Sequence, residues 1–249
     1  MLKGIYTAAS GMVAETIRTD VIANNLANAS TTGYKKDLAV NKSFGDLLLS
    51  KLEGKEAPEE IGGVGSGVFV DQVVPTFALG VFRDTGNTLD LALEGDGFFA
   101  VETPNGERYT RDGAFHLDQE GYLVTADGHQ VLGENGPINL AGTNFKSIVI
   151  NANGQIFVEQ NQVASLRIVE FADKKALQKE GNSLWVGNGA AEDAKAQVRQ
   201  GTLESSNVNT VTEMVNLITA TRAYEISQKM IQTQDSSLDK AVNEVGRVG

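Results

Sequence analysis

Cysteine is absent from the 249 residues of this chain, and its absence removes several kinds of chemistry at once. Disulfide bonds, thiolate metal sites and cysteine nucleophiles are all excluded by the residue inventory. Histidine is nearly as scarce, with only His116 and His129 in the whole sequence. A metal site built from several histidines is therefore excluded too, and we expect neither a metal ion nor another cofactor.

The chain is also poor in positive charge and lacks long apolar runs. The chain carries 21 lysine and arginine residues against 32 aspartate and glutamate residues, a formal net charge of -11. Phosphate neutralisation needs clustered positive charge, so we expect no nucleic-acid partner. No stretch approaches the roughly 20 apolar residues of a membrane-spanning helix, so we expect no direct membrane insertion. Residues 1–29 lack the basic start, apolar block and cleavage site of a signal peptide, so we expect no cleavable signal.

The acidic charge is concentrated in the middle of the chain. Residues 1–36 carry four basic and two acidic side chains, and residues 203–249 carry four and six. The residues between them carry thirteen basic and twenty-four acidic side chains, a net charge of -11. The two ends are therefore nearly neutral, which suits surfaces that meet other protein chains.

The N-terminal segment, residues 1–34, has the pattern of an amphipathic helix. Apolar residues recur at three- and four-residue spacing, at Leu2, Ile5, Ala9, Met12 and Ile17. We expect this helix to run to about Leu26. The run from Asn28 to Gly33 consists of cap and turn formers, and Gly33 suits a left-handed stop.

Residues 35–67 give weaker signals, and we expect a linker or extended region there. The segment from Phe44 to Leu49 is compatible with a short helix, whereas residues 53–67 are rich in charge and glycine and predict a long exposed loop. The glycines at 62–67 resemble a phosphate-binding loop only superficially, because the Lys-Ser/Thr ending and the preceding strand are missing.

Residues 68–201 predict a central antiparallel all-β domain. Apolar residues alternate with polar ones there, and turn signals recur at Asn105-Gly106, Asp127-Gly128, Asn135-Gly136 and Asn153-Gly154. Asn-Gly and Asp-Gly are strong signals for tight hairpins, so short strands at this spacing predict a sandwich or a barrel. We expect Phe171 and Trp185 to lie in the core of its last strands.

Residues 202–249 predict a second helix with a coiled-coil seam. Thr210-Val-Thr-Glu213 matches a capping box ahead of an apolar run. Five apolar residues then follow at spacings of seven, at Leu217, Tyr224, Ile231, Leu238 and Val245. The predicted fold class is therefore α+β, with N- and C-terminal amphipathic helices forming a coiled-coil-like assembly domain around a central β domain.

A comparison of burial free energy with backbone entropy indicates that these helices need packing partners. Burying five large apolar side chains supplies roughly 7 to 15 kcal/mol. Ordering about 35 helical residues costs about 1 to 2 kcal/mol each in backbone entropy, of which the hydrogen bonds recover only part. We therefore expect the two end helices to pack on each other and on other chains.

An enzyme is the alternative to a structural protein. The acids Asp112, Asp118, Glu120 and Asp127 raise the possibility of a calcium site or of paired-carboxylate chemistry in a carbohydrate hydrolase with helical oligomerisation ends. The spacing of a calcium-binding loop is not met, however, and acids beside glycines are typical hairpin formers. Without titratable groups that converge in a pocket, we expect that the chain is not an enzyme.

Several segments resemble the bacterial flagellar rod and hook family. The first is Val21-Ile-Ala-Asn-Asn-Leu-Ala-Asn-Ala-Ser-Thr-Thr-Gly-Tyr-Lys35, which is similar to the family's N-terminal signature. The segments 86–99 and 109–113 resemble its β core, and residues 201–209, Glu213-Met-Val-Asn216 and Arg222-Ala-Tyr-Glu225 resemble its C-terminal helix. Segments 130–138, 231–235 and 244–248 most resemble proximal rod members, while Arg222-Ala-Tyr-Glu-Ile226 also suits distal ones.

The resemblance implies a structural subunit that self-assembles into a hollow helical shaft, which transmits torque from motor to hook. It implies other copies of the chain, neighbouring rod proteins and the flagellar type III export apparatus as partners. It also implies a place in the basal body, where the rod spans the periplasm.

The expected assembly interface lies on the two end helices and on the turn after the first. We expect Asn24, Asn25 and Asn28 to fix register between copies, with helix capping as a weaker interpretation. The full set is Leu2, Ile5, Ala9, Met12, Ile17, Asn24, Asn25, Leu26, Asn28, Gly33, Tyr34, Leu217, Tyr224, Ile231, Leu238 and Val245.

Overall fold

The computed structural model describes residues 2–45, 47–51, 59–141, 148–181, 183–187 and 191–243. Two compact units make up the chain. The first contains residues 1–27, 37–76 and 209–249, and the second contains residues 28–36 and 77–208. The chain therefore crosses from one unit to the other four times.

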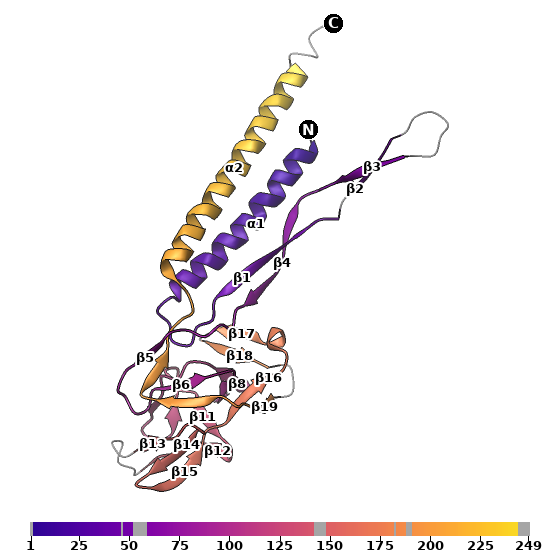
Figure 1. Cartoon of the computed structure of the whole chain (residues 1–249). Coiled ribbons are helices and arrows are strands. Elements are labelled where there is room, and N and C mark those ends of the chain that lie inside the picture. The colour runs from indigo at the N-terminus through magenta and orange to yellow at the C-terminus, as the bar shows by residue number, and fades with distance from the viewer. Residues whose placement is uncertain are drawn as a thin grey trace. The chain divides into compact units, whose positions relative to one another are not determined.

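Two long helices from opposite ends of the sequence dominate the first unit (Figure 1). They are α1 (Leu2–Ala27) and α2 (Thr210–Asn243). Gly4 of α1 faces Gln234 of α2, and Gly11 faces Ser227, so the helices are antiparallel. The predicted end of the first helix near Leu26 is confirmed.

The second helix begins with a cap that differs from the predicted one. The Oδ1 of Asn209 accepts a hydrogen bond from the amide of Thr212 at 3.0 Å. The backbone carbonyl of Asn209 accepts one from the amide of Glu213 at 2.9 Å. Asn209 is therefore the N-cap, one residue before Thr210. Both side chains can accept such a bond, and Asn ranks slightly above Thr at this position.

A β-ribbon completes the first unit where the sequence predicted a linker. Strand β1 (Asp37–Ser43) pairs antiparallel with β4 (Val68–Pro75), and β2 (Leu47–Lys51) pairs with β3 (Glu59–Val64). Residues 47–49 of the short helix considered for 44–49, and residues 59–64 of the long loop predicted for 53–67, are therefore strands, while residues 46 and 53–58 lie outside the described residues. Strands β1 and β4 are separated by more than twenty residues in the sequence, so no tight-turn signal predicts that they pair.

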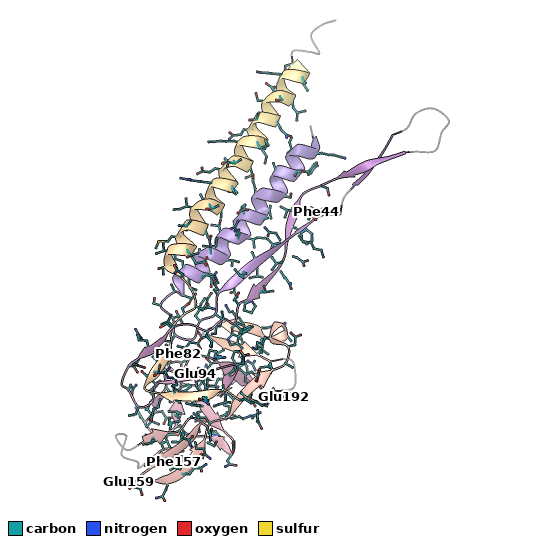
Figure 2. All side chains as sticks on the ribbon, in the orientation of Figure 1. Phe44, Phe82, Glu94, Phe157, Glu159 and Glu192 are labelled. Atoms are coloured by element: carbon teal, nitrogen blue, oxygen red, sulfur yellow. The ribbon has the colours of Figure 1, made fainter. Side chains whose placement is uncertain are left out.

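The ribbon packs on α1 through particular polar contacts. The amide of Val68 donates to Ser10 Oγ at 3.2 Å, and strands β1 and β4 both contact the helix. Figure 2 marks Phe44 beyond β1, where its ring lies 5.0 Å from that of Phe69. The predicted β domain therefore loses its first strand, β4, to the helical unit.

The second unit is antiparallel throughout its described pairings, as predicted. Its largest sheet has the order β17-β18-β8-β7-β11-β10-β9, with β12, β16 and β19 attached, and β13-β14-β15 form a smaller sheet. Two further pairs are β20 with β6 and β21 with β5. The strands are β5 (Phe82–Asp84), β6 (Leu91–Glu94), β7 (Phe98–Thr103), β8 (Gly106–Thr110), β9 (His116–Leu117), β10 (Leu123–Val124), β11 (Gln130–Gly133), β12 (Gly136–Pro137), β13 (Ile148–Ile150), β14 (Gln155–Val158), β15 (Asn161–Ser165), β16 (Ile168–Phe171), β17 (Gln178–Gly181), β18 (Leu184–Val186), β19 (Ala191–Asp193), β20 (Gln197–Gln200) and β21 (Thr202–Glu204). One turn of 3-10 helix, Lys174–Ala176, precedes β17.

All four predicted glycine turns join antiparallel neighbours. Asn105-Gly106 joins β7 to β8, Asp127-Gly128 joins β10 to β11, Asn135-Gly136 joins β11 to β12, and Asn153-Gly154 joins β13 to β14. Each of these glycines has a positive φ, which a residue with a Cβ adopts at a cost.

Two hydrophobic clusters form the core of this unit. The larger contains mostly aliphatic side chains from the sheet faces, whereas the smaller is aromatic and includes Phe98, Phe171 and Trp185. Phe171 and Trp185 are therefore core residues of late strands, as predicted.

Candidate functional site

Two of the acids that suggested an enzyme, Asp112 and Asp118, accept hydrogen bonds from backbone amides of their own turns. Asp118 Oδ1 accepts hydrogen bonds from the amides of Glu120 and Tyr122, at 2.9 and 2.7 Å. Asp112 Oδ1 accepts from Ala114 N at 3.1 Å and from Thr32 Oγ1 at 2.7 Å. Among the described residues, no group of three histidine, aspartate or glutamate side chains could hold a metal ion. Neither helix, as far as it is described, has an apolar stretch long enough to cross a bilayer.

The predicted C-terminal seam lies on the side of α2 that faces α1. Leu217, Tyr224, Ile231 and Leu238 are all half-buried. Residues three or four positions away on the same face, Glu213 and Ala220, are 3% and 0% exposed, and Ser227 and Gln234 face glycines of α1. Much of the predicted seam is therefore covered within the chain. Val245 lies outside the described residues.

Small residues on α1 let the two helices approach closely. A Cβ on Gly4 would collide with the Gln234 side chain, and one on Gly11 would lie 3.7 Å from Ser227 Oγ. Ala14 is buried as well, whereas the predicted contacts Ile5, Ala9, Met12, Ile17 and Leu26 are half-buried. The side chain of Leu2 is not among those described.

The three asparagines have different surroundings. Asn25 is 1% exposed, and its amide group donates to the carbonyl of Asp37 at 2.8 Å and accepts from the amide of Asp37 at 2.9 Å. It therefore joins the end of α1 to the start of β1 within the chain. Asn28 Oδ1 accepts from Thr31 Oγ1 at 3.3 Å, and Asn24 is exposed on the helix.

The turn after α1 anchors in the second unit. Gly33 has a φ of 65° and donates its amide to the carbonyl of Glu204 at 2.8 Å. The ring of Tyr34, 8% exposed, stacks under the Nζ of Lys179 at 4.4 Å. Both predicted residues thus hold residues 28–36 against the β structure of their own chain.

A buried charge cluster that the sequence did not reveal lies beside this turn. Lys35 Nζ lies 2.5 Å from Glu204 Oε1, and Arg111 Nη1 lies 3.5 Å from Glu204 Oε2. The three side chains are at most 4% exposed. Burial lowers the pKa of Lys35 and of Arg111, and the Glu204 carboxylate opposes both shifts. Nothing in the local sequence around Lys35 distinguishes it from the exposed lysine that a surface turn would carry.

The outer faces of the two helices carry large exposed apolar side chains. On α1, Tyr6 and Val13 are 72% and 61% exposed. On α2, the exposed set is Val211, Met214, Val215, Ile218, Ile226, Met230 and Val242, each more than half exposed. Several large exposed apolar side chains on the same helices make these faces a candidate contact surface. Their spacing was visible in the sequence, but the regular heptad seam was the stronger signal.

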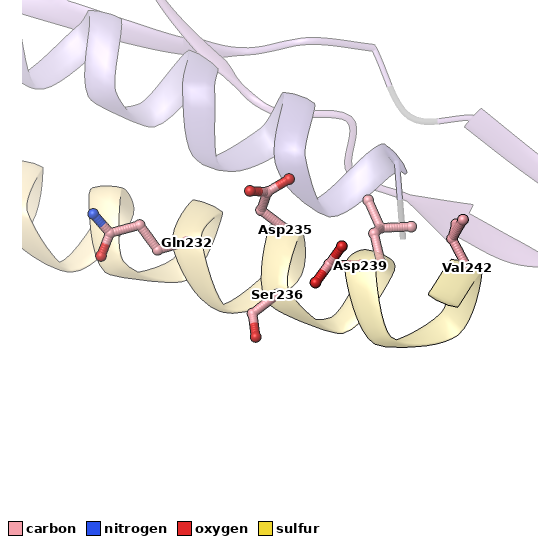
Figure 3. A pocket seen from close by; sticks show the side chains of 6 residues that line it. Gln232, Asp235, Ser236, Asp239 and Val242 are labelled. Atoms are coloured by element: carbon pink, nitrogen blue, oxygen red, sulfur yellow. The ribbon is translucent and has the colours of Figure 1, made fainter. Parts of the chain in front are cut away.

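A shallow hollow lies near the end of α2 (Figure 3). Its lining comes from that one helix and includes Asp235, Leu238, Asp239 and Val242. The arrangement offers two carboxylates beside two apolar side chains, but no converging set of acid, base and nucleophile.

Comparison with known proteins covers both helices and the β core. A family model of the C-terminal region of flagellar basal body rod FlgEFG proteins matches residues 199–244. A model of the flagellar hook protein FlgE/F/G D1 domain matches residues 92–158, and a model of flagella basal body rod proteins matches residues 5–35.

Curated relatives match the chain over nearly its full length. The flagellar basal-body rod protein FlgG of Bacillus subtilis is 33% identical over 98% of the chain and 99% of the relative. FlgG of Borreliella burgdorferi is 36% identical over 98% of each. FlgF of Rhizobium meliloti, also a flagellar basal-body rod protein, is 34% identical over 99% of each.

Proposed function

The chain belongs to the family of flagellar basal-body rod proteins, and we propose that it builds the rod by packing its terminal helices against those of other copies. Its role is that of a structural subunit of the flagellar basal body. The hydrolase alternative has no support from the relatives, which are named as rod proteins.

One observation carries the assembly mechanism. The antiparallel pair of α1 and α2 covers one face of each helix and leaves apolar side chains exposed on the other faces. A monomer gains nothing from six exposed valine, isoleucine, methionine and tyrosine side chains within α1 and the first turns of α2. Burying them between copies would supply about 1 kcal/mol or more for each large side chain.

The β unit supports a different part of the role. It is stabilised by its own core and by the buried cluster of Lys35, Arg111 and Glu204, none of which needs a neighbour. It also carries most of the acidic side chains. We propose that it takes no part in the helix contacts that build the shaft, through which torque passes from motor to hook.

The proposal also covers how the chain reaches the rod and where along the rod it lies. The chain would reach the rod, which spans the periplasm, through the flagellum's own type III apparatus and would contact neighbouring rod proteins there. Segments 130–138 and 231–248 favour a proximal position, while relatives named FlgG and FlgF are similar to the chain to about the same degree.

Deletion and labelling of the chain test the proposal. Cells that lack it should build basal bodies without a complete rod and without a hook, and a tagged copy should restore both. Electron microscopy of purified basal bodies with a label against the tag should show the label on the rod and near its proximal end. A label elsewhere, or complete rods without the chain, would refute the role, and a distal label would correct only the position.

A further inference from the structure

Hydrogen bonds inside the second unit tie together the places where the chain leaves that unit. The four crossings between the units lie at residues 27–28, 36–37, 76–77 and 208–209. Three short segments of the second unit lead to these crossings, and we call them the exit segments. They are residues 33–36, 77–80 and 204–208, and all of them belong to the second unit.

The side chain of Asn207 joins all three exit segments. Its Oδ1 accepts a hydrogen bond from the amide of Lys36 at 2.8 Å, and its Nδ2 donates to the carbonyl of Ala78 at 3.1 Å. The backbone amide of Asn207 also donates to the carbonyl of Tyr34 at 3.3 Å. The oxygen and the nitrogen of one side-chain amide thus each hold the backbone of a different exit segment.

The Lys35 side chain makes a second connection among the same segments. Its Nζ donates to the carbonyl of Ala78 at 3.0 Å and lies 2.5 Å from Glu204 Oε1. The amide of Gly33 donates to the carbonyl of Glu204 at 2.8 Å. Residues 33–36 are therefore bonded to both of the other exit segments, and they also follow the crossing at residues 27–28.

The two connections differ in what their loss would leave behind. Lys35 and Glu204 are buried charges, so the removal of either one disturbs the interior of the unit. Asn207 is half-buried and neutral, and Ala78 is exposed. Water can replace a hydrogen bond at such a place, so the bond contributes little net free energy to folding. Water cannot, however, hold two backbone segments at a fixed spacing.

We propose that Asn207 is a positioning residue for the joint between the two units, because it fixes the spacing of the exit segments. The crossing at residues 36–37 leads into β1, the crossing at 76–77 follows β4, and the crossing at 208–209 leads into α2. With these three places held by one side chain, the units change orientation only by bending of the few residues beyond each crossing.

The stiffness of this joint matters for a subunit under load. In the proposed rod, torque that acts on the helices reaches the β unit through the four crossings. Exit segments that are free to move apart would let each unit turn without the other. Only this consequence for torque depends on the proposed function, since the bonds of Asn207 lie inside a single unit of a single chain.

Spin labels on the full-length chain test the proposal, and the absence of cysteine makes the labelling specific. Thr219→Cys provides an exposed position on α2, and Glu102→Cys provides an exposed position on β7. Pulsed electron paramagnetic resonance then measures the distribution of distances between the two units. Asn207→Ala in this labelled parent should broaden the distribution, while urea unfolding of the β unit changes little.

Two further variants separate positioning from a general loss of structure. Asn151 Oδ1 accepts hydrogen bonds from the amides of Asn153 and Gln155, both at 3.0 Å, within one turn of the β unit. Asn151→Ala therefore removes comparable bonds away from the exit segments and should leave the distribution narrow. Asn207→Asp keeps the acceptor for the amide of Lys36 but not the donor to Ala78, so it should broaden the distribution in part. It also serves as the test variant if Asn207→Ala does not fold.

Each outcome decides the role of Asn207. Broadening in Asn207→Ala and Asn207→Asp, with Asn151→Ala as narrow as the labelled parent, is the expected result. Equal widths in the parent and in the Asn207 variants would refute the proposal, whether all are narrow or all are broad. Equal broadening in Asn151→Ala would show a general loosening of the β unit and would refute it too. The rod role is decided separately, by the position of the tagged chain in basal bodies.

Discussion

The ammonium group of Lys35 and the carboxylate of Glu204 lie 2.5 Å apart and are both buried, although 169 positions separate them in the sequence. Lys35 also donates to the carbonyl of Ala78 at 3.0 Å, and Glu204 also accepts from the amide of Gly80 at 2.8 Å. The pair thus joins the turn after the first helix to the last strand before the second helix, inside one unit.

The cluster has two cations and one anion, so substitutions of its members should lower the free energy of unfolding by unequal amounts. Glu204→Gln leaves two buried cations, Lys35 and Arg111, without their anion and should cost roughly 3 to 5 kcal/mol of unfolding free energy. Lys35→Met leaves the Arg111–Glu204 pair and should cost less, since Asn207 Nδ2 still donates to the freed carbonyl of Ala78 at 3.1 Å. Urea unfolding of the purified chain measures both. Equal costs, or a larger cost for Lys35→Met, would contradict this account.

Asp112 predicts a dependence of stability on pH. Burial raises its pKa above the ordinary 3.8, while hydrogen bonds from Thr32 and Ala114 oppose the rise. A raised folded-state pKa means that the contribution to stability is complete below 3.8 and is lost as pH rises through the folded pKa. Asp112→Asn keeps an oxygen acceptor and should gain stability relative to the wild type between pH 3.8 and neutrality.

Thr32→Val provides the matched control for that titration. It removes a donor that lowers the pKa of Asp112, so the loss of stability with rising pH should become larger than in the wild type. Unfolding curves at several pH values measure the three proteins together. A constant difference between Asp112→Asn and the wild type at every pH would disprove the linkage.

Gly33 combines a left-handed backbone with a close neighbour. Its φ is 65°, and a Cβ would collide with the backbone of Arg111 and Asp112. Gly128 has a φ of 83° with nothing near its Cβ position, so Gly128→Ala should cost only the backbone term of about 1 kcal/mol. Gly33→Ala should cost clearly more in thermal unfolding. Similar costs would mean that the turn moves away without penalty.

Ala220 tests the packing inside the helix pair. Its side chain is fully buried on the face of α2 that carries the seam. Ala220→Leu adds volume where none is free and should cost about 1 to 3 kcal/mol. Hydrogen exchange should show faster exchange along α1 and α2 than in the wild type, with the β unit unchanged. Unchanged exchange in both helices would show that the pair is not held by this contact.

How far the sequence predicted this fold depends on the range of the interactions involved. Both helices, the Asn105-Gly106 hairpin and the core positions of Phe171 and Trp185 were predicted, because periodicity and turn chemistry are local. The ribbon of β1 and β4 was missed because its partners meet across a long insertion with no turn signal.

What covers the predicted seam of the second helix could not be predicted for a related reason. The heptad of Leu217 to Leu238 identifies an apolar face but does not tell whether a helix of the same chain or of another copy covers it. The structure brings α1 to that face. The Lys35–Glu204 pair was missed because an isolated lysine in a polar turn carries no sign of burial.

Ile218→Asp tests the central claim, that copies of the chain assemble through the outer faces of their terminal helices, most directly. Ile218 is 54% exposed, so the free energy of unfolding of the purified variant should lie within about 0.5 kcal/mol of the wild-type value. In cells it should leave basal bodies without a complete rod, because a carboxylate without a partner would be buried at every contact. Thr233→Asp, on the charged part of the same helix, should still build rods. Complete rods with Ile218→Asp, or a clearly destabilised monomer, would contradict the account.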